Sequence, residues 1–106
     1  MQTFVFTLSN KRRGQQTNDL LVAHVNHLKR LKASGSLVIC GPYSDNDGAI
    51  QIIRSSSIAE AKILFEADPF IQEGYYQNYD VRELLVASDE NNWLVDSDQT
   101  KLNLKE

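Results

Sequence analysis

The sequence predicts an α+β domain of the ferredoxin-like type, a four-stranded antiparallel sheet with two helices on one face. Four apolar segments of strand length and two amphipathic segments of helix length follow one another in the order βαββαβ. Right-handed crossovers in the two βαβ halves place both helices on the same side of the sheet. We expect this domain to cover residues 1–87 and residues 88–106 to be a C-terminal extension.

The first expected strand covers residues 3–8, where Phe4, Phe6 and Leu8 alternate with threonine and valine. Alternation with a period of two is typical of a strand that turns one face toward a core. The polar loop 9–16 follows. Its basic cluster could lie over a pocket and attract an anion, or could simply be solvated; it consists of Lys11, Arg12 and Arg13.

A long amphipathic helix is expected next, with Thr17 or Asn18 as its N-cap. Gly35 ends this helix, because glycine adopts the left-handed conformation common just after a helix without a steric penalty. Residues 37–40 are a continuous apolar run of strand length, which predicts an inner strand buried on both faces. The Gly-Pro pair at residues 41–42 should end that strand.

The second half of the chain repeats the pattern. Residues 45–48 have turn composition and predict a hairpin that leads into a strand over residues 49–54. Ser57 and Glu60 have the spacing of a capping box and open the second helix. A final strand is expected over residues 79–86.

Composition and charge limit the classes of function. At 106 residues, 42% hydrophobic and 24% charged, the chain fits one globular domain. A net charge of −3 argues against nucleic-acid binding, and residues 49–54 lack the stacking aromatics of an RNA-binding sheet. No apolar run reaches the ~20 residues needed to cross a membrane. Cys40 is the only cysteine, so neither an internal disulfide nor a cysteine zinc site is expected. The chain is predicted to be cytoplasmic.

The strands are apolar on both faces, and two helices can cover only one of them. The other face needs a second cover, because a large exposed apolar patch is unfavourable in water. A second copy of the same sheet would supply it. We therefore predict a homodimer with the two sheets packed face to face.

A histidine stands inside the apolar stripe of the first helix. His24 shares this stripe with Leu20, Leu28 and Leu31, so its imidazole needs a hydrogen-bonding partner. Asp68 is the candidate, since it continues the stripe of the second helix at that helix's C-terminal end, where the helix dipole disfavours a carboxylate. A carboxylate that fixes the tautomer of an imidazole makes it a better general base.

The same residues also fit a structural alternative. His24 could be a satisfied core histidine, and Asp68 a surface residue that caps the turn after Pro69. His27 is expected to be exposed or at the flank of its helix.

Several short motifs in order resemble the YCII-related (YciI-like) family over about residues 3–87. They are His24, Gly35, Leu37, Gly41-Pro42, Asp47-Gly48, Ser57-x-x-Glu-Ala61, Asp68-Pro-Phe70 and Gly74. The resemblance implies a ferredoxin-like fold, assembly into a dimeric α/β barrel, and a His-Asp pair in a pocket. By the family's spacing the pair is His24 and Asp68. Some relatives have an arginine where this chain has Leu21.

The leading hypothesis is a small cofactor-free enzyme, without a metal, that performs proton transfer or elimination on a small organic molecule. His24 would be the general base and Asp68 would orient it. Predicted substrate contacts come from Phe6, Gly41, Pro42 and Phe70. The alternative is a non-catalytic small-ligand-binding or interaction module. A haem-binding dimeric α/β barrel has only fold analogy in its favour.

The extension contains one apolar cluster, Trp93, Leu94 and Val95. Burial of a tryptophan removes roughly 150–250 Å² from water, so we expect this cluster to dock on the body of the dimer.

Overall fold

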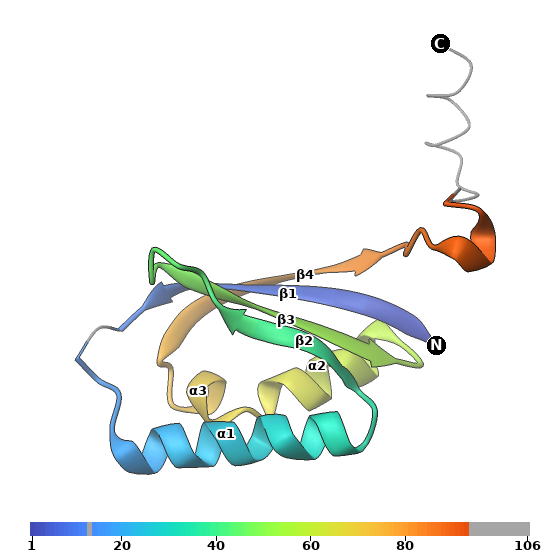
Figure 1. The fold of residues 1–106 in the computed structure, drawn as a ribbon. Helices are drawn as coiled ribbons and strands as arrows, with labels where there is room; N and C mark the ends of the chain where they lie inside the picture. Colours follow the sequence, from blue (N-terminus) through green and yellow to red (C-terminus); the bar gives the residue numbers. More distant parts are fainter. Residues whose placement is uncertain (13, 94–106) are drawn as a thin grey trace.

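The computed structural model describes residues 1–12 and 14–93 and confirms the ferredoxin-like α+β fold (Figure 1). Four strands form one antiparallel sheet, and the helices cover one of its faces. The elements in chain order are β1 (Gln2–Lys11), α1 (Asn18–Ala33), β2 (Leu37–Pro42), β3 (Gly48–Ser55), α2 (Ile58–Glu66), α3 (Pro69–Gln72), β4 (Tyr76–Leu84) and a 3₁₀ turn (Asp89–Asn91).

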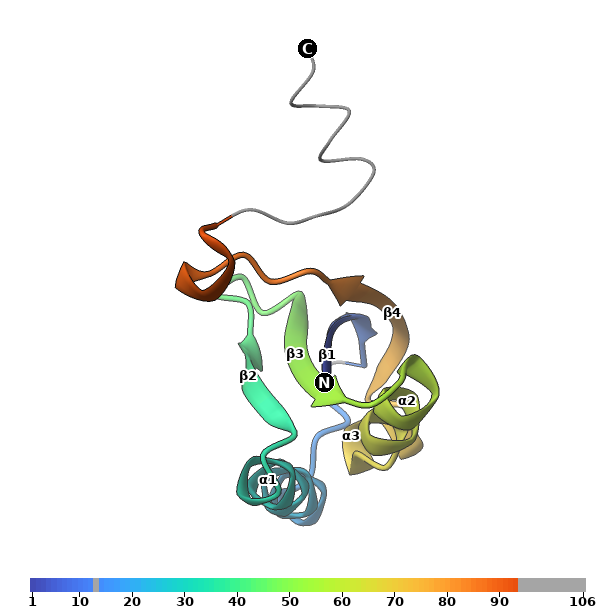
Figure 2. The same cartoon turned by 90° about the vertical axis from the view of Figure 1, so that its right-hand side faces the viewer.

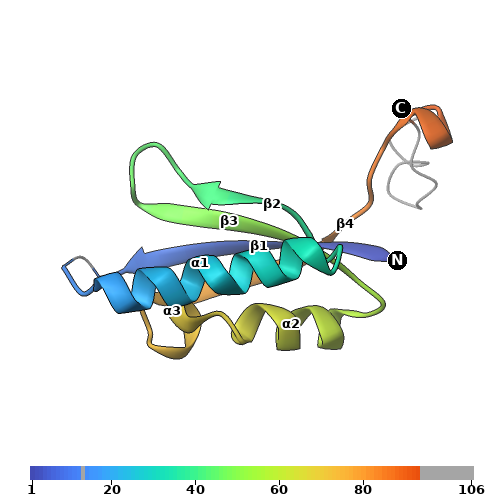
Figure 3. The same cartoon turned by 60° about the horizontal axis from the view of Figure 1, so that its bottom comes forward.

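The strands lie in the order β2-β3-β1-β4, so β1 and β3 are the inner pair. Figure 2 shows the sheet end-on, with α1 on the β2 side and α2 and α3 on the β4 side of the same face. Figure 3 shows α1 and α2 side by side beneath the sheet. This layering leaves the opposite face of the sheet open in the single chain. None of the described helices is long and apolar enough to cross a membrane.

The helix boundaries follow the expected caps. The Thr17 hydroxyl accepts a hydrogen bond from the Leu20 amide at 3.1 Å, and Gly35 follows α1 at φ 82°, in the left-handed region. Ser57 caps α2 by accepting from the Glu60 amide at 3.1 Å. Between sheet and helices lies an apolar core, with Phe4, Phe6, Leu8, Leu31, Leu37, Ile53, Ala61 and Phe65 among its buried members.

The prediction that residues 37–40 form an inner strand is wrong. β2 is an edge strand, and Val38 and Ile39 are 45% and 60% exposed. Ile39 pairs with Ile52 of β3, and paired residues share a face of the sheet. The neighbours of Ile52 along β3, Gln51 and Ile53, are buried on the core side. The side chains of Ile52 and Ile39 therefore lie on the open face. An apolar run shows that both faces of a strand avoid water, but it does not show whether a neighbouring strand or another molecule covers them.

Asp68 does not end the second helix, which corrects a second expectation. α2 ends at Glu66, and Asp68 is the N-cap of the short helix α3. Its Oδ1 accepts a hydrogen bond from the Phe70 amide at 2.9 Å. Asp68 still follows the C-terminal end of α2 directly, but the backbone hydrogen bond from Phe70 favours its carboxylate there and offsets the conflict inferred from the sequence. The capping role in the structural alternative is present, although Asp68 is buried rather than on the surface.

The open face of the sheet is only partly apolar. On β1 and β3 it presents half-buried Val5, Ile50 and Ile52, but on β4 it presents the exposed side chains of Asp80 and Arg82. The expectation of strands apolar on both faces therefore fails for the middle of β4, although Leu84 at its end is apolar and exposed on this face.

In the C-terminal extension, Trp93 is 66% exposed on the single chain. Leu94 and Val95 lie outside the described residues. Docking of this cluster on the body of the dimer remains a prediction, as does the cytoplasmic location.

Candidate active site

His24 and Asp68 meet between α1 and the start of α3. The Nδ1 atom of His24 lies 2.8 Å from Oδ1 and 3.0 Å from Oδ2 of Asp68. The His24 side chain is 15% exposed and that of Asp68 is 0% exposed. The two residues are 44 positions apart in sequence, and the packing of both helical segments on one sheet face brings them together. The pairing expected from the sequence is therefore present.

Asp68 is held by donors from three elements. Besides His24, the Gln51 amide nitrogen on β3 donates to Oδ2 at 2.9 Å, and the Phe70 backbone N–H donates to Oδ1. Burial alone raises the pKa of Asp68, but the hydrogen bonds from His24, Phe70 and Gln51 outweigh it and lower the pKa below its usual value. Asp68 is therefore an ionised acceptor at neutral pH.

An ionised Asp68 decides the tautomer of a neutral His24. Since the carboxylate only accepts hydrogen bonds, Nδ1 of the imidazole must carry the proton that it shares. The other ring nitrogen, Nε2, then has a free lone pair. The ring also stacks on Phe70, with centroids 3.7 Å apart and planes 3° from parallel. The imidazole is thus fixed in both orientation and tautomer.

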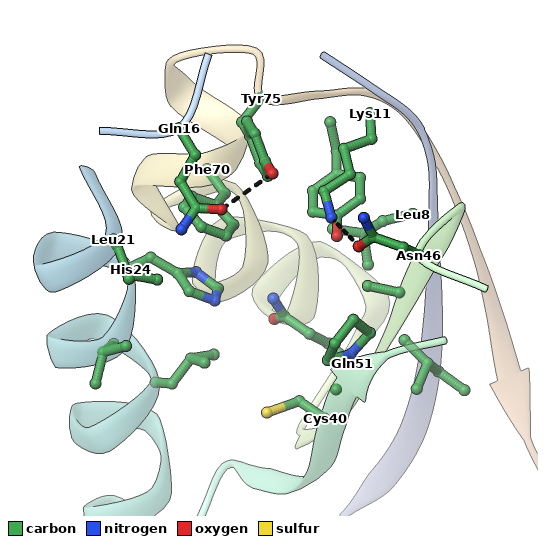
Figure 4. Close-up of a pocket in the computed structure, with 17 residues that line it drawn as sticks. Leu8, Lys11, Gln16, Leu21, His24, Cys40, Asn46, Gln51, Phe70 and Tyr75 are labelled. Atoms are coloured by element: carbon green, nitrogen blue, oxygen red, sulfur yellow. Dashed lines mark hydrogen bonds between the residues drawn. The ribbon is translucent and has the colours of Figure 1, made fainter. Parts of the chain in front are cut away.

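His24 forms part of the wall of a cavity of about 510 Å³ between α1 and the β2–β3 half of the sheet (Figure 4). A cavity of this size suits a small organic molecule. Asp68 does not line it and lies behind His24. The lining is mostly apolar and includes Leu8, Leu21, Val25, Leu28, Cys40, Gly41, Pro42, Ile50, Phe70, Tyr75 and Tyr76, with polar groups from Lys11, Gln16, Asn46 and Gln51.

Three of the four predicted substrate contacts, Gly41, Pro42 and Phe70, line this cavity. Phe6 does not. Its ring is 0% exposed and stacks on Phe65 in the core, with centroids 4.2 Å apart. Phe6 is on the core-facing side of β1, but Leu8 is the residue of that side that lines the cavity.

Sequence reasoning did not single out Gln51. The signal was available, because a glutamine on the core-facing side of a strand must find a hydrogen-bonding partner. Its partner is Asp68, so Gln51 supports the pair from the sheet side.

A family model described as the YCII-related domain matches residues 1–85. The chain belongs to the YCII-related domain family. This confirms the resemblance seen in the sequence motifs. A curated relative, the uncharacterized protein YjpA of Bacillus subtilis (strain 168), is 28% identical over 71 residues, which are 67% of this chain and 84% of that protein.

A solved structure has the same fold at 24% sequence identity. It is the 5-chloro-2-hydroxyhydroquinone dehydrochlorinase (TftG) of Burkholderia phenoliruptrix AC1100 in complex with 2,5-dihydroxybenzoquinone. The match has a TM-score of 0.64 and covers 85% of this chain and 99% of that one. At this identity the likeness establishes the fold of the YCII-family chain.

His27 of this YCII-family chain is buried, at 5% exposure, and not at an exposed flank as the sequence suggested. Its Nε2 atom has no hydrogen-bond partner within the described part of the chain. Burial lowers the pKa of His27 below the ordinary value of 6.5; Arg30 and His24 add to the effect, and Asp68 and a hydrogen bond with the Leu64 backbone oppose it. His27 is therefore neutral in the folded chain at neutral pH.

This burial predicts that the fold becomes less stable as the pH falls below about 6.5. In that range His27 binds a proton in the unfolded chain but stays neutral in the folded chain, which lowers the free energy of unfolding. Asp68 adds a second loss at lower pH, because its folded-state pKa also lies below its ordinary value. In urea titrations between pH 7.5 and pH 5, His27→Phe should lose less unfolding free energy than the unmodified protein, whereas equal losses would contradict the assignment.

Within residues 1–12 and 14–93, no group of three or more histidine, cysteine, aspartate or glutamate side chains could hold a metal ion. Cys40 lines the cavity, but burial and then the charge of Asp68 raise the pKa of its thiol. It is therefore a protonated, weakly nucleophilic group at neutral pH.

Proposed function

We propose that this protein is a small enzyme that performs proton transfer or elimination on a small organic molecule, with His24 as general base. The observation that supports this most strongly is the buried carboxylate of Asp68 at 2.8 Å from Nδ1 of a histidine that lines an apolar cavity. Asp68 is a positioning residue, because it acts through His24 and does not line the cavity.

In the proposed reaction, Nε2 of His24 removes a proton from a carbon or oxygen of the substrate. In an isomerisation the electron pair of the broken bond delocalises into an adjacent carbonyl group, and the proton returns elsewhere. In an elimination the pair forms a new double bond, and a leaving group departs with its own bonding electrons. Asp68 stabilises the imidazolium formed at His24, while Gly41, Pro42 and Phe70 shape the space for the substrate.

The structural neighbour supports a cyclic substrate. That enzyme is a dehydrochlorinase, and its complex contains 2,5-dihydroxybenzoquinone, a planar six-membered ring. The cavity described above has aromatic walls from Phe70, Tyr75 and Tyr76, which suit a planar ring.

The test uses two assays on the purified protein. One follows chloride release from 5-chloro-2-hydroxyhydroquinone, and the other follows deuterium uptake from solvent by cyclic ketones and phenols. The proposal is supported if the protein turns over at least one compound and the His24→Gln variant does not. Binding of these compounds in the cavity without turnover by any of them would instead support the non-catalytic ligand-binding module.

We further propose that the chain forms a homodimer through the open face of the sheet. The apolar side chains there have no cover in the single chain, and Ile39 at 60% exposure extends the half-buried row of Val5, Ile50 and Ile52. Asp80 and Arg82 of β4 would pair across the interface or lie at its rim.

This dimer predicts a clear effect of a charge on the open face. Ile39→Glu should weaken the dimer at least roughly 30-fold, because an unpaired charge buried in an interface costs on the order of 2 kcal/mol or more. Ile63→Glu is the matched control, since Ile63 is 70% exposed on α2, away from this face. Sedimentation velocity at micromolar concentration measures the outcome, and an unmodified protein that is monomeric there would contradict the dimer.

A further inference from the structure

Lys11 supplies positive charge to the cavity from the end of β1. Among the described residues that line the cavity, it alone is a lysine or arginine. Its Nζ donates to the Asn46 side-chain oxygen and lies 5.6 Å and 5.9 Å from the ring centroids of Tyr75 and Tyr76. Two separate parts of the chain, the β2–β3 turn and the start of β4, therefore hold this ammonium group in place.

These contacts orient the charge without neutralising it. Asn46 offers a neutral amide oxygen, and its backbone at φ 64° adopts the left-handed conformation that asparagine tolerates well. The tyrosine rings attract the ammonium through their electron-rich faces. An amide and two rings leave the full positive charge available to a bound molecule.

Lys11 and His24 approach the cavity from opposite sides. Figure 4 shows Lys11 with Asn46 on one side and His24 with Leu21 on the other, with the side chain of Gln51 between them. The side chains that fill the α1 wall next to His24 are apolar, among them Leu21 and Val25. A ligand that spans the cavity would meet the histidine at one end and the ammonium at the other.

The charge of Asp68 makes this arrangement selective. Its field reaches across the site, since Asp68 contributes to raising the pKa of both Cys40 and Tyr76, after burial for Cys40 and after burial and Tyr75 for Tyr76. A negative ligand would be repelled by Asp68 unless a cation faced it. Lys11 is that cation within the described lining.

We propose that Lys11 binds an ionised oxygen of the substrate, so that the substrate class is a small cyclic acid, a phenol, enol or carboxylic acid. This inference rests on the proposed function, because it places the reacting hydrogen at His24 and the anionic oxygen at Lys11. In the reaction, the ammonium stabilises the negative charge on that oxygen as His24 removes the proton.

The test uses benzoate and benzamide, which have nearly the same shape but differ in charge. Binding is followed by NMR, with the Gly41 amide and the Gln51 side-chain amide reporting on the cavity. We expect benzoate to bind at least about 10-fold more tightly than benzamide, as a charge-assisted hydrogen bond implies. Lys11→Met should remove this preference, and Lys11→Arg should keep most of it.

Lys29→Met is the matched control, because Lys29 is an exposed lysine of α1 that does not line the cavity. It should leave both affinities within about twofold. Equal binding of benzoate and benzamide, or an unchanged preference in Lys11→Met, would overturn the role of Lys11 and leave His24 as the proposed base. No binding of either probe at millimolar concentration would contradict both the role of Lys11 and the use of the cavity as a substrate site.

Discussion

Replacing His24 by glutamine is expected to lower the rate of the catalysed reaction by about 10²- to 10⁴-fold, the usual contribution of a general base. Glutamine has a similar size and keeps a polar end, but it cannot take up a proton at neutral pH. Since the lost group acts on the transition state, the loss should appear in kcat more than in KM. Steady-state kinetics on the best compound from the two assays measures the effect.

His27→Gln is the control for this variant. It makes the same chemical change three positions further along α1, in a side chain that does not line the cavity. Thermal unfolding must first show that both variants fold. A folded His24→Gln protein that retains more than about a tenth of the activity would remove His24 from the role of base.

Replacing Asp68 by alanine should destabilise the fold by roughly 3–5 kcal/mol, because removal of one member of a buried polar cluster leaves the others without partners. The variant would leave three hydrogen-bond donors, from His24, Gln51 and Phe70, without an acceptor at a site with 0% exposure. A loss of this size is a large part of the 5–15 kcal/mol typical of a domain. Urea unfolding at fixed protein concentration measures it.

Glu73→Ala serves as the comparison, since Glu73 is an exposed carboxylate at the other end of α3. Its effect should stay within about 0.5 kcal/mol. A similarly small effect of Asp68→Ala would mean that the hydrogen bonds at Asp68 do not organise the site.

Local signals explain how much of the fold the sequence predicted. Thr17, Gly35 and Ser57 act through hydrogen bonds or backbone conformations within a few residues, and each has its expected role. The edge position of β2 and the exposure of Ile39 depend on which strands are neighbours. Which strands are neighbours is a long-range property, and an apolar run has the same sequence pattern in an inner strand and in an edge strand.

In the candidate site, too, local features could be predicted and features that depend on long-range packing could not. His24 could be predicted because an imidazole inside an apolar stripe needs a partner, and Asp68 because it continues the apolar stripe of the second helix and stands in the family's Asp-Pro-aromatic motif. The short helix α3, which gives Asp68 its capping role, is too brief to leave a periodic signal. His27 was misplaced because its burial depends on how the neighbouring elements pack around α1, not on its angle in the apolar stripe.

Lys11 shows what sequence alone could not resolve. Lys11 stood in a cluster of three basic residues, and only the contacts with Asn46, Tyr75 and Tyr76 distinguish it. Those contacts join the end of β1 to the β2–β3 turn and to the start of β4, segments far apart in the chain.

The most direct test of the central claim is the tautomer of His24, measured by long-range ¹H–¹⁵N correlation NMR at a pH where the ring is neutral. We expect the proton on Nδ1 and a free lone pair on Nε2, because Asp68 accepts from Nδ1 at 2.8 Å. In Asp68→Asn the new amide group can donate to Nδ1, so the proton should move to Nε2. A proton on Nε2 in the unmodified protein would mean that His24 cannot act as the base in the cavity.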